Sequence, residues 1–169
     1  MFGNLKKTRI IAYSAAFIGL ISLGAWVSIP FFPVPLTLQT LFVLLASAVM
    51  KRYAVIPVSL YVLLGALGLP VYHTGVTGIG ILLGPTGGYL IGFIFAALVV
   101  GLAYEHESET IRITGLIAGT VIIYIFGVAW LMYSLAIGPG PAIISGMLPF
   151  IPGDAIKVYA AYRIAQRLP

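Results

Sequence analysis

Two side chains of opposite charge, Asp154 and Lys157, stand three residues apart near the end of the chain. On a helix this spacing places both side chains on the same face. A carboxylate accepts hydrogen bonds and an ammonium donates them, so the pair could hold a polar solute. Alternatively, the two groups could satisfy each other as a structural ion pair. The surroundings of the pair decide between these two roles.

The rest of the chain is strongly apolar. Of its 169 residues, 61% are hydrophobic and 8% are charged, whereas soluble domains have roughly 25% charged residues. Nine Lys or Arg and four Asp or Glu residues are too few to cover the surface of a soluble protein of this size. The mean hydropathy of +1.12 also indicates a protein that lies in lipid. A soluble enzyme is therefore disfavoured, and the net charge of +5 is better explained by membrane topology than by nucleic acid binding.

Six segments have the apolar character of membrane-spanning helices, although the second and fourth are somewhat short. A bilayer core of about 30 Å needs about 20 helical residues. The predicted fold is an all-α membrane protein with six transmembrane helices, forming a single integral membrane domain over residues 1–169. The predicted spans are approximately residues 10–29, 36–50, 53–69, 89–104, 111–137 and 143–163.

The positions of Lys and Arg predict the orientation of these spans. Eight of the nine lie before the first span, between the second and third, at the start of the fifth or after the sixth. In a chain with six spans, all of these positions fall on the same face of the membrane. The positive-inside rule makes this face cytoplasmic, with both termini inside the cell membrane. The exception is Lys157, which falls with Asp154 inside the last span. An ionisable residue there costs about 2.5–3.5 kcal/mol on insertion scales, so the pair is a functional candidate.

Proline and glycine gather in the three outer connections, residues 30–40, 70–88 and 138–154, which hold nine of the 11 prolines in or beside them. Non-helical backbone at membrane depth is tolerated only where protein buries it or a cavity hydrates it. The outer half of the bundle is therefore the expected site. Pro152, with its neighbours, could break the last span and leave Asp154 near the first turn of a half-helix, where negative charge is favoured.

Other polar residues near these connections are weaker candidates for ligand contacts. An amide at the start of the second span offers both a donor and an acceptor, although interhelical hydrogen bonding is the alternative. In residues 86–89, bare glycine backbone beside a hydroxyl and a phenol would let a flat ring approach, or would serve helix packing. His73 is assigned to solvent or to loop bracing rather than to ligation. The predicted ligand-binding residues are Asp154, Lys157, Gln39, Thr37, Thr40, Thr86, Gly87, Gly88 and Tyr89.

Motifs of the main enzyme classes are missing from the sequence. It has no cysteine, no Gly-Lys pair for a phosphate-binding loop and no His-Glu-x-x-His metal motif. No second carboxylate can work with Asp154 in acid–base chemistry, and neither a metal site nor a cofactor is predicted. The favoured interpretation is a small membrane protein that binds a solute and relies on other subunits for energy. A stand-alone facilitator, or a membrane-embedded enzyme with Asp154 as base, are the alternatives.

Three segments carry a family resemblance: residues 33–40 read PVPLTLQT, residues 84–89 read GPTGGY, and residues 149–157 read PFIPGDAIK. Together they resemble the signature segments of the BioY family, the biotin-binding S components of energy-coupling factor transporters. The resemblance covers nearly the whole chain. It implies a six-helix subunit that captures biotin from outside and works with a transmembrane coupling subunit and two ATPases. It also implies that Asp154 and Lys157 hold polar groups of biotin, without assigning an end of the ligand to either.

The resemblance also implies a docking face for the coupling subunit. In the family the first helix carries an Ala-x-x-x-Ala face, and Ala12 and Ala16 match it. Small residues four apart let two helices approach closely. Gly115 and Gly119 have the same spacing in the fifth predicted span and are a competing interface.

Overall fold

The computed structural model describes residues 2–168, with side chains from residue 6 onward. This part of the chain contains eight α-helices, two short 3-10 helices and one pair of antiparallel strands. The α-helices are α1 (Phe2–Trp26), α2 (Gln39–Met50), α3 (Val55–Ala66), α4 (Ile79–Leu83), α5 (Gly87–Ala103), α6 (Glu109–Leu135), α7 (Pro139–Gly146) and α8 (Ile151–Ala165). The 3-10 helices are η1 (Lys51–Ala54) and η2 (His73–Gly75), and the strands are β1 (Ser28–Ile29) and β2 (Leu36–Thr37), with Ser28 opposite Thr37.

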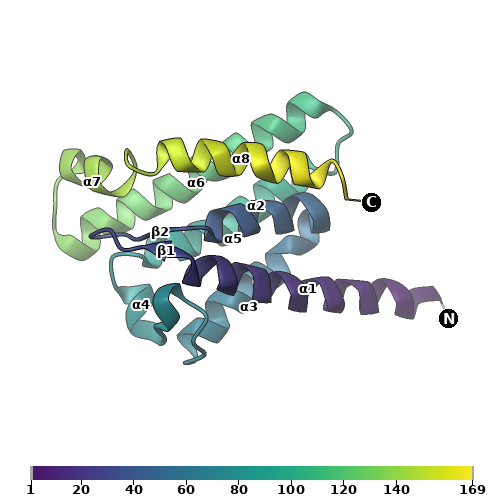
Figure 1. Cartoon of the computed structure of the whole chain (residues 1–169), viewed down its shortest axis with the longest axis horizontal. Coiled ribbons are helices and arrows are strands. Elements are labelled where there is room, and N and C mark those ends of the chain that lie inside the picture. Colours follow the sequence, from purple (N-terminus) through teal and green to yellow (C-terminus); the bar gives the residue numbers. More distant parts are fainter. Residues whose placement is uncertain (1, 169) are drawn as a thin grey trace.

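The long helices run roughly side by side, with the irregular segments gathered at one end (Figure 1). The strand pair, α4 and α7 lie at the left-hand end of this view, and both chain ends lie at the right. The three connections rich in proline and glycine thus meet at the same end of the bundle, as expected from the sequence. The opposite end has the short η1 turn and the turn between α5 and α6.

Three helical stretches among the described residues are long and apolar enough to cross a membrane: Lys6–Trp26, Gln39–Ala66 and Glu109–Leu135. The helix α5 is apolar but shorter. The second stretch is not one straight rod, because Lys51 has a φ of +56° and the chain reverses at η1 between α2 and α3 (Figure 1). The molecule is therefore a predominantly helical protein of membrane type.

The last predicted span, residues 143–163, is not a single helix. Helix α7 ends at Gly146 and α8 begins at Ile151, so four turn residues separate them. Pro152 lies in the first turn of α8. Backbone N–H groups in the first turn have no acceptor within the helix, so the missing N–H of proline costs no hydrogen bond there. The break expected just before Asp154 is confirmed, and Asp154 lies in the first turn of α8. The second predicted span also begins later than expected, because residues 36–37 pair as β2.

Glycines let α5 and α6 pack against each other at close range. A side chain at Gly115 would lie 2.2 Å from the Cβ of Ala103, and one at Gly119 would lie 2.4 Å from Val100. Both distances are far below van der Waals contact. The Gly115–Gly119 pair is therefore occupied inside the bundle, and it does not offer a free face to another subunit.

Candidate ligand-binding site

A chamber lies at the end of the bundle where the three irregular connections meet, and it is called the outer chamber here. It leaves about 590 Å³ free of protein atoms, including the part that opens outward. Nine of its sixteen lining residues are aromatic or aliphatic, and polar side chains among the rest could fix the orientation of a small organic ligand. Its lining residues are Val34, Pro35, Thr37, Gln39, Thr40, Tyr72, His73, Thr86, Tyr89, Leu90, Phe93, Ile123, Tyr124, Phe150, Asp154 and Lys157.

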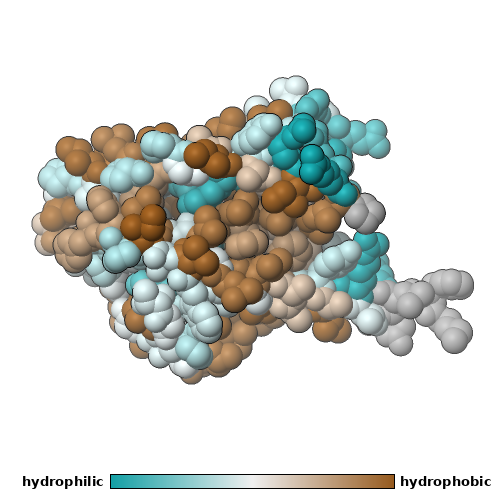
Figure 2. Space-filling model, in the orientation of Figure 1, coloured by the Kyte–Doolittle hydropathy of each residue, from teal (hydrophilic) through white to brown (hydrophobic). Residues whose placement is uncertain are grey.

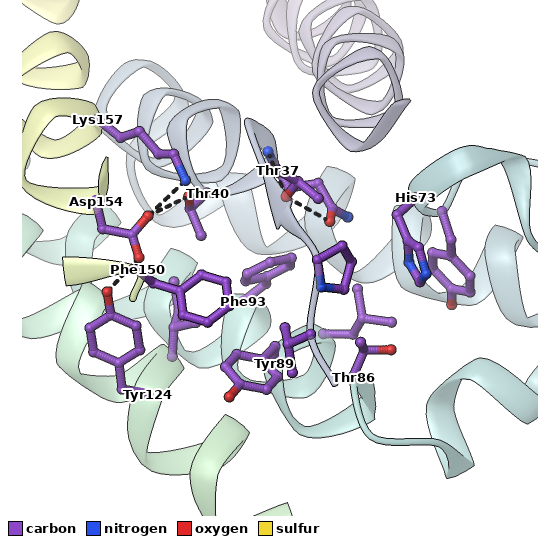
Figure 3. Close-up of a pocket in the computed structure, with 16 residues that line it drawn as sticks. Thr37, Thr40, His73, Thr86, Tyr89, Phe93, Tyr124, Phe150, Asp154 and Lys157 are labelled. Atoms are coloured by element: carbon purple, nitrogen blue, oxygen red, sulfur yellow. Dashed lines mark hydrogen bonds and ion pairs between the residues drawn. The ribbon is translucent and has the colours of Figure 1, made fainter. Parts of the chain in front are cut away.

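Asp154 and Lys157 form one wall of this chamber (Figure 3). The Lys157 Nζ donates to Asp154 Oδ1 at 2.8 Å, and Thr40 Oγ1 donates to the same oxygen at 3.2 Å. The Tyr124 hydroxyl donates to Asp154 Oδ2 at 2.5 Å. Asp154 is 5% exposed. One buried carboxylate thus connects α2, α6 and α8.

The ion pair retains capacity for further hydrogen bonds. A carboxylate can accept about four hydrogen bonds and an ammonium can donate three. Asp154 accepts three, from Lys157, Thr40 and Tyr124, whereas Asp154 Oδ1 is the one acceptor recorded for Lys157 within the described residues. One acceptor position and two donor positions are therefore left beside an open chamber. This arrangement favours a ligand site over a purely structural pair.

Gln39 and Thr37 belong to a chain of hydrogen bonds that braces the outer loops. Thr37 Oγ1 donates to Gln39 Oε1 at 3.2 Å, and Gln39 Nε2 donates to the Tyr61 hydroxyl at 2.5 Å. The Tyr61 hydroxyl in turn donates to the carbonyl of Val71 at 3.0 Å. Both residues line the chamber, but much of their hydrogen-bonding capacity is used within the protein.

The four residues of the 86–89 stretch have different environments. Thr86 and Tyr89 line the chamber, and the Tyr89 hydroxyl donates to the carbonyl of Gly146 at 2.7 Å. Gly87 and Gly88 are not part of the lining. A side chain at Gly87 would lie 1.8 Å from the carbonyl oxygen of Leu82, and one at Gly88 would lie 2.2 Å from Trp130. These two glycines therefore permit close packing around the site, rather than exposing backbone to the chamber.

His73 lies across the chamber from the ion pair (Figure 3). Three hydrogen bonds fix the segment that leads to it. Trp26 Nε1 donates to the carbonyl of Pro70 at 3.1 Å, the Tyr61 hydroxyl bonds the carbonyl of Val71, and the Tyr72 hydroxyl donates to the carbonyl of Val62 at 2.6 Å. Burial lowers the pKa of His73 below its usual value. His73 was predicted to contact solvent or to brace its loop, and its place in the chamber wall has no signal in the sequence.

Sequence reasoning also missed several aromatic residues of the wall, including Tyr124, Phe93 and Phe150. An aromatic residue in an apolar span is most simply explained by packing or by contact with lipid. No sequence signal distinguished Tyr124 from the other tyrosines, because its role depends on the distance between α6 and α8.

Ala12 and Ala16 lie on an exposed face of α1. Gly19, three residues further along, continues this face, since a side chain built there would meet no atom within 4 Å. The Ala12–Ala16 face is thus free for another helix, in contrast to the buried Gly115–Gly119 pair. A search of the described residues finds no group of three or more His, Cys, Asp or Glu side chains that could hold a metal ion.

Comparison with known families covers almost the whole chain. The sequence profile of the BioY family matches residues 2–169. The chain belongs to the BioY family. A BioY relative named biotin transporter BioY from Thermotoga maritima is 45% identical over 162 residues, which cover 95% of both chains. A protein named probable biotin transporter BioY from Pyrococcus horikoshii is 39% identical, covering 96% of this chain and 97% of the relative.

A solved structure shares the fold of this BioY chain. It is described as the S-component for biotin from an ECF-type ABC transporter, and it matches with a TM-score of 0.87 and 28% identity, covering 97% of this chain and 92% of the other. The resemblance inferred from the three sequence segments is therefore confirmed. BioY membership places the chain in a family of membrane transporters and not among enzymes.

Proposed function

We propose that this protein binds biotin with high affinity in the outer chamber and is the substrate-binding subunit of an ATP-driven energy-coupling factor transporter. The observation that carries the proposal is the Asp154–Lys157 pair, which borders the chamber and can still form further hydrogen bonds. The chain that carries this pair belongs to the BioY family. The relatives named as biotin transporters support the ligand. The solved S-component supports the role in a larger assembly, with a transmembrane coupling subunit and ATPases. Biotin is the transported ligand, and the proposed function requires no cofactor.

The proposed topology has six membrane spans in one domain over residues 1–169, with both termini in the cytoplasm. The sixth span is the broken pair α7 and α8. Hydrophilic residues gather at the end of the molecule where the termini lie, while much of the remaining visible surface is apolar (Figure 2). This distribution and the positive-inside rule support a cytoplasmic position for that end. The outer chamber then faces the outside.

The proposed orientation of biotin places its ureido ring at the ion pair. A ureido group has N–H donors and a carbonyl acceptor, which match the acceptor position left on Asp154 and the donor positions left on Lys157. The ureido ring then occupies the free positions on both charged groups, so the valerate carboxylate is assigned to the opposite side of the chamber near His73. Thr40, Thr86 and Tyr89 complete the proposed contact set. Thr37 and Gln39 are given a supporting role, and Gly87 and Gly88 a packing role.

Thermal unfolding of the purified protein tests the ligand assignment. Biotin is expected to raise the unfolding free energy by RT ln(1 + [L]/Kd), which is about 2.7 kcal/mol at 100 times Kd. Biotin methyl ester keeps the ureido ring but lacks the negative charge, so it is expected to stabilise less than biotin. Riboflavin serves as the control vitamin. Stabilisation by riboflavin and none by biotin would contradict the proposed ligand while leaving the transport class intact.

His73 is expected to make biotin binding depend on pH. Burial lowers the pKa of His73 in the free protein, whereas an adjacent ligand carboxylate would raise it. Binding then takes up a proton, so affinity should increase as the pH falls from about 8 to about 5 and should level off below the pKa of the free protein. Isothermal titration calorimetry in two buffers of different ionisation enthalpy would measure the proton uptake.

A His73→Gln variant keeps a polar side chain but cannot gain a charge, so it should bind biotin with little pH dependence in this range. The other charged groups of the chamber, Asp154 and Lys157, lie across it from His73 (Figure 3) and remain in the variant. An unchanged pH profile in His73→Gln would show that the carboxylate does not lie beside this histidine.

The proposed docking surface for the coupling subunit is the exposed face of α1 that carries Ala12 and Ala16. Its small side chains allow close helix contact. The buried position of Gly115 and Gly119 supports this choice over the competing interface.

A further inference from the structure

A second cavity lies at the opposite end of the bundle and is called the inner cavity here. It leaves about 1090 Å³ free of protein atoms, including its open part. The ends of four helices surround it: the C-terminal ends of α2, α5 and α8 and the N-terminal end of α6. Hydrophilic residues are visible near the C-terminal end of α8 in Figure 2. The proposed transport function uses none of the groups in this cavity.

The inner cavity carries two positive and two negative side chains, namely Lys51, Arg112, Glu107 and Glu109. Arg112 is held in place, since its Nε donates to the carbonyl of His106 at 2.8 Å. Its guanidinium carbon also lies 5.7 Å from the centre of the Tyr104 ring, in the range of a cation–π contact. The cavity thus has fixed charges of both signs and a net charge near zero.

The backbone at the edge of the cavity is strained. Lys51 has a φ of +56°, which is unfavourable for a residue with a side chain. Its carbonyl oxygen packs against Gly101, where an added side chain would lie 2.4 Å away. Strain of this kind is most often found at functional sites.

Tyr104 provides a further observation that points to a ligand. It lines the cavity and is 6% exposed, and its hydroxyl has no hydrogen-bond partner among the described residues. Nearly all buried polar groups in native proteins have a partner, and a buried group without one destabilises the folded state. A bound molecule could supply the missing partner.

We propose that the inner cavity binds the headgroup of a zwitterionic phospholipid that carries a primary ammonium, such as phosphatidylethanolamine. The phosphate is assigned to Arg112, Lys51 and the Tyr104 hydroxyl, and the ammonium to Glu107 and Glu109. A headgroup with only a negative charge would leave Glu107 and Glu109 without a counter-charge, since Glu109 accepts a hydrogen bond only from the neutral Tyr162 hydroxyl. The proposal rests on the proposed topology, which places this end of the bundle at the inner leaflet, at the height of the lipid headgroups.

The apolar part of the lining favours a lipid over a soluble zwitterion. Ala48, Val49, Ala165 and Leu168 form the apolar part of the wall, beside the polar Tyr162 and Gln166, and can contact the glycerol and the first acyl carbons. These residues lie at the ends of α2 and α8, at the height of the membrane surface in the proposed topology.

The test measures thermal unfolding of the full-length protein in nanodiscs. The discs contain phosphatidylcholine alone, or phosphatidylcholine with either phosphatidylethanolamine or phosphatidylglycerol. The melting temperature is expected to be highest with phosphatidylethanolamine. The rise in melting temperature above phosphatidylcholine alone should be lost in Arg112→Gln and reduced in Tyr104→Phe and Glu107→Gln. It should be retained in the control variant Arg163→Gln, which removes a charge at the same end of the protein but outside the cavity. Comparing increments within each variant separates lipid binding from any change in basal stability.

Equal melting temperatures in all three kinds of disc, or loss of the increment in Arg163→Gln as well, would overturn the proposal. An equal increment with phosphatidylglycerol and phosphatidylethanolamine would also overturn it, because a phosphate alone would then be sufficient. Soluble phosphoethanolamine added to phosphatidylcholine discs distinguishes the source: a shift as large as that of the lipid would assign the cavity to a soluble ligand. Biotin stabilisation is measured on the same samples, so failure of this proposal and failure of biotin binding are recorded separately.

Discussion

Replacing Asp154 or Lys157 by alanine is expected to weaken biotin binding by about 2–5 kcal/mol, which is the usual effect on binding of truncating one partner of a buried, hydrogen-bonded charge pair. Asp154→Ala removes the acceptor for Thr40, Tyr124 and Lys157 together. Lys157→Ala leaves a carboxylate that is 5% exposed without its counter-charge. Each change also removes one of the proposed partners of the ureido ring. Equilibrium binding of radiolabelled biotin to the purified variants measures the loss.

A double variant, Asp154→Asn with Lys157→Met, separates binding from folding. It removes both charges at once, so neither is left buried and unpaired, and replacing a buried pair in this way is often neutral or stabilising. Its thermal stability without ligand is therefore expected to match or exceed that of the single variants. Biotin affinity should still be lost, because the ureido ring lacks both charged partners. Normal binding by the double variant would show that the pair is purely structural.

Tyr124→Phe is the matched control for the hydrogen-bond network. It removes only the hydroxyl that bonds Asp154 Oδ2 and keeps the ring in the chamber wall. A single hydrogen bond to a charged group contributes about 1.5–3 kcal/mol, so binding should weaken less than in Asp154→Ala. An effect as large as that of Asp154→Ala would instead make Tyr124 a principal determinant of the site.

The Asp154–Lys157 pair could be found from the sequence because charge is rare in an apolar chain and each buried charge needs an explanation. The break before Asp154 was also visible, since proline is restricted to the first turn of a helix. These signals are local. The place of Tyr124 was not predictable, because it depends on how α6 and α8 pack, and nothing in the residues around it differs from an ordinary lipid-facing or core position.

The spacing of small residues also predicts close packing without predicting which element packs there. For Gly87 and Gly88 the sequence allowed either ligand contact or helix packing, and the nearby backbone of Leu82 and side chain of Trp130 favour packing. Gly115–Gly119 and Ala12–Ala16 have the same spacing, yet the first pair is buried against α5 and the second is exposed on α1. Spacing identifies a close-packing face but not the helix that packs there. The position of His73 in the chamber wall was not visible in the sequence for a similar reason, since contacts with α1 and α3 fix the loop before it.

Replacing Ala16 by phenylalanine is expected to reduce ATP-driven uptake strongly and to leave biotin binding unchanged. Ala16 lies on the exposed face of α1, and its side chain is not part of the chamber lining. A bulky group there would hold another helix away from the α1 backbone. Overpacking costs about 1–3 kcal/mol, which corresponds to a roughly 5- to 150-fold weaker association, and Ala12→Phe should act in the same way. Uptake into proteoliposomes that contain the coupling subunit and ATPases, together with copurification of these subunits, measures both effects.

Ala118→Phe provides the control for a large residue on a free helix face. Ala118 is exposed on α6, next to Ile117, which is 51% exposed, so a phenylalanine there should meet only lipid. Uptake by Ala118→Phe is expected to be normal. Loss of uptake in this variant alone would move the docking surface to α6, and normal uptake in all three variants would remove the docking role from α1.

Because biotin binding is measured on the same preparations, a folding defect in an Ala16 variant would be detected as lost binding. Loss of uptake with normal binding would then be explained only by failed contact with the coupling subunit.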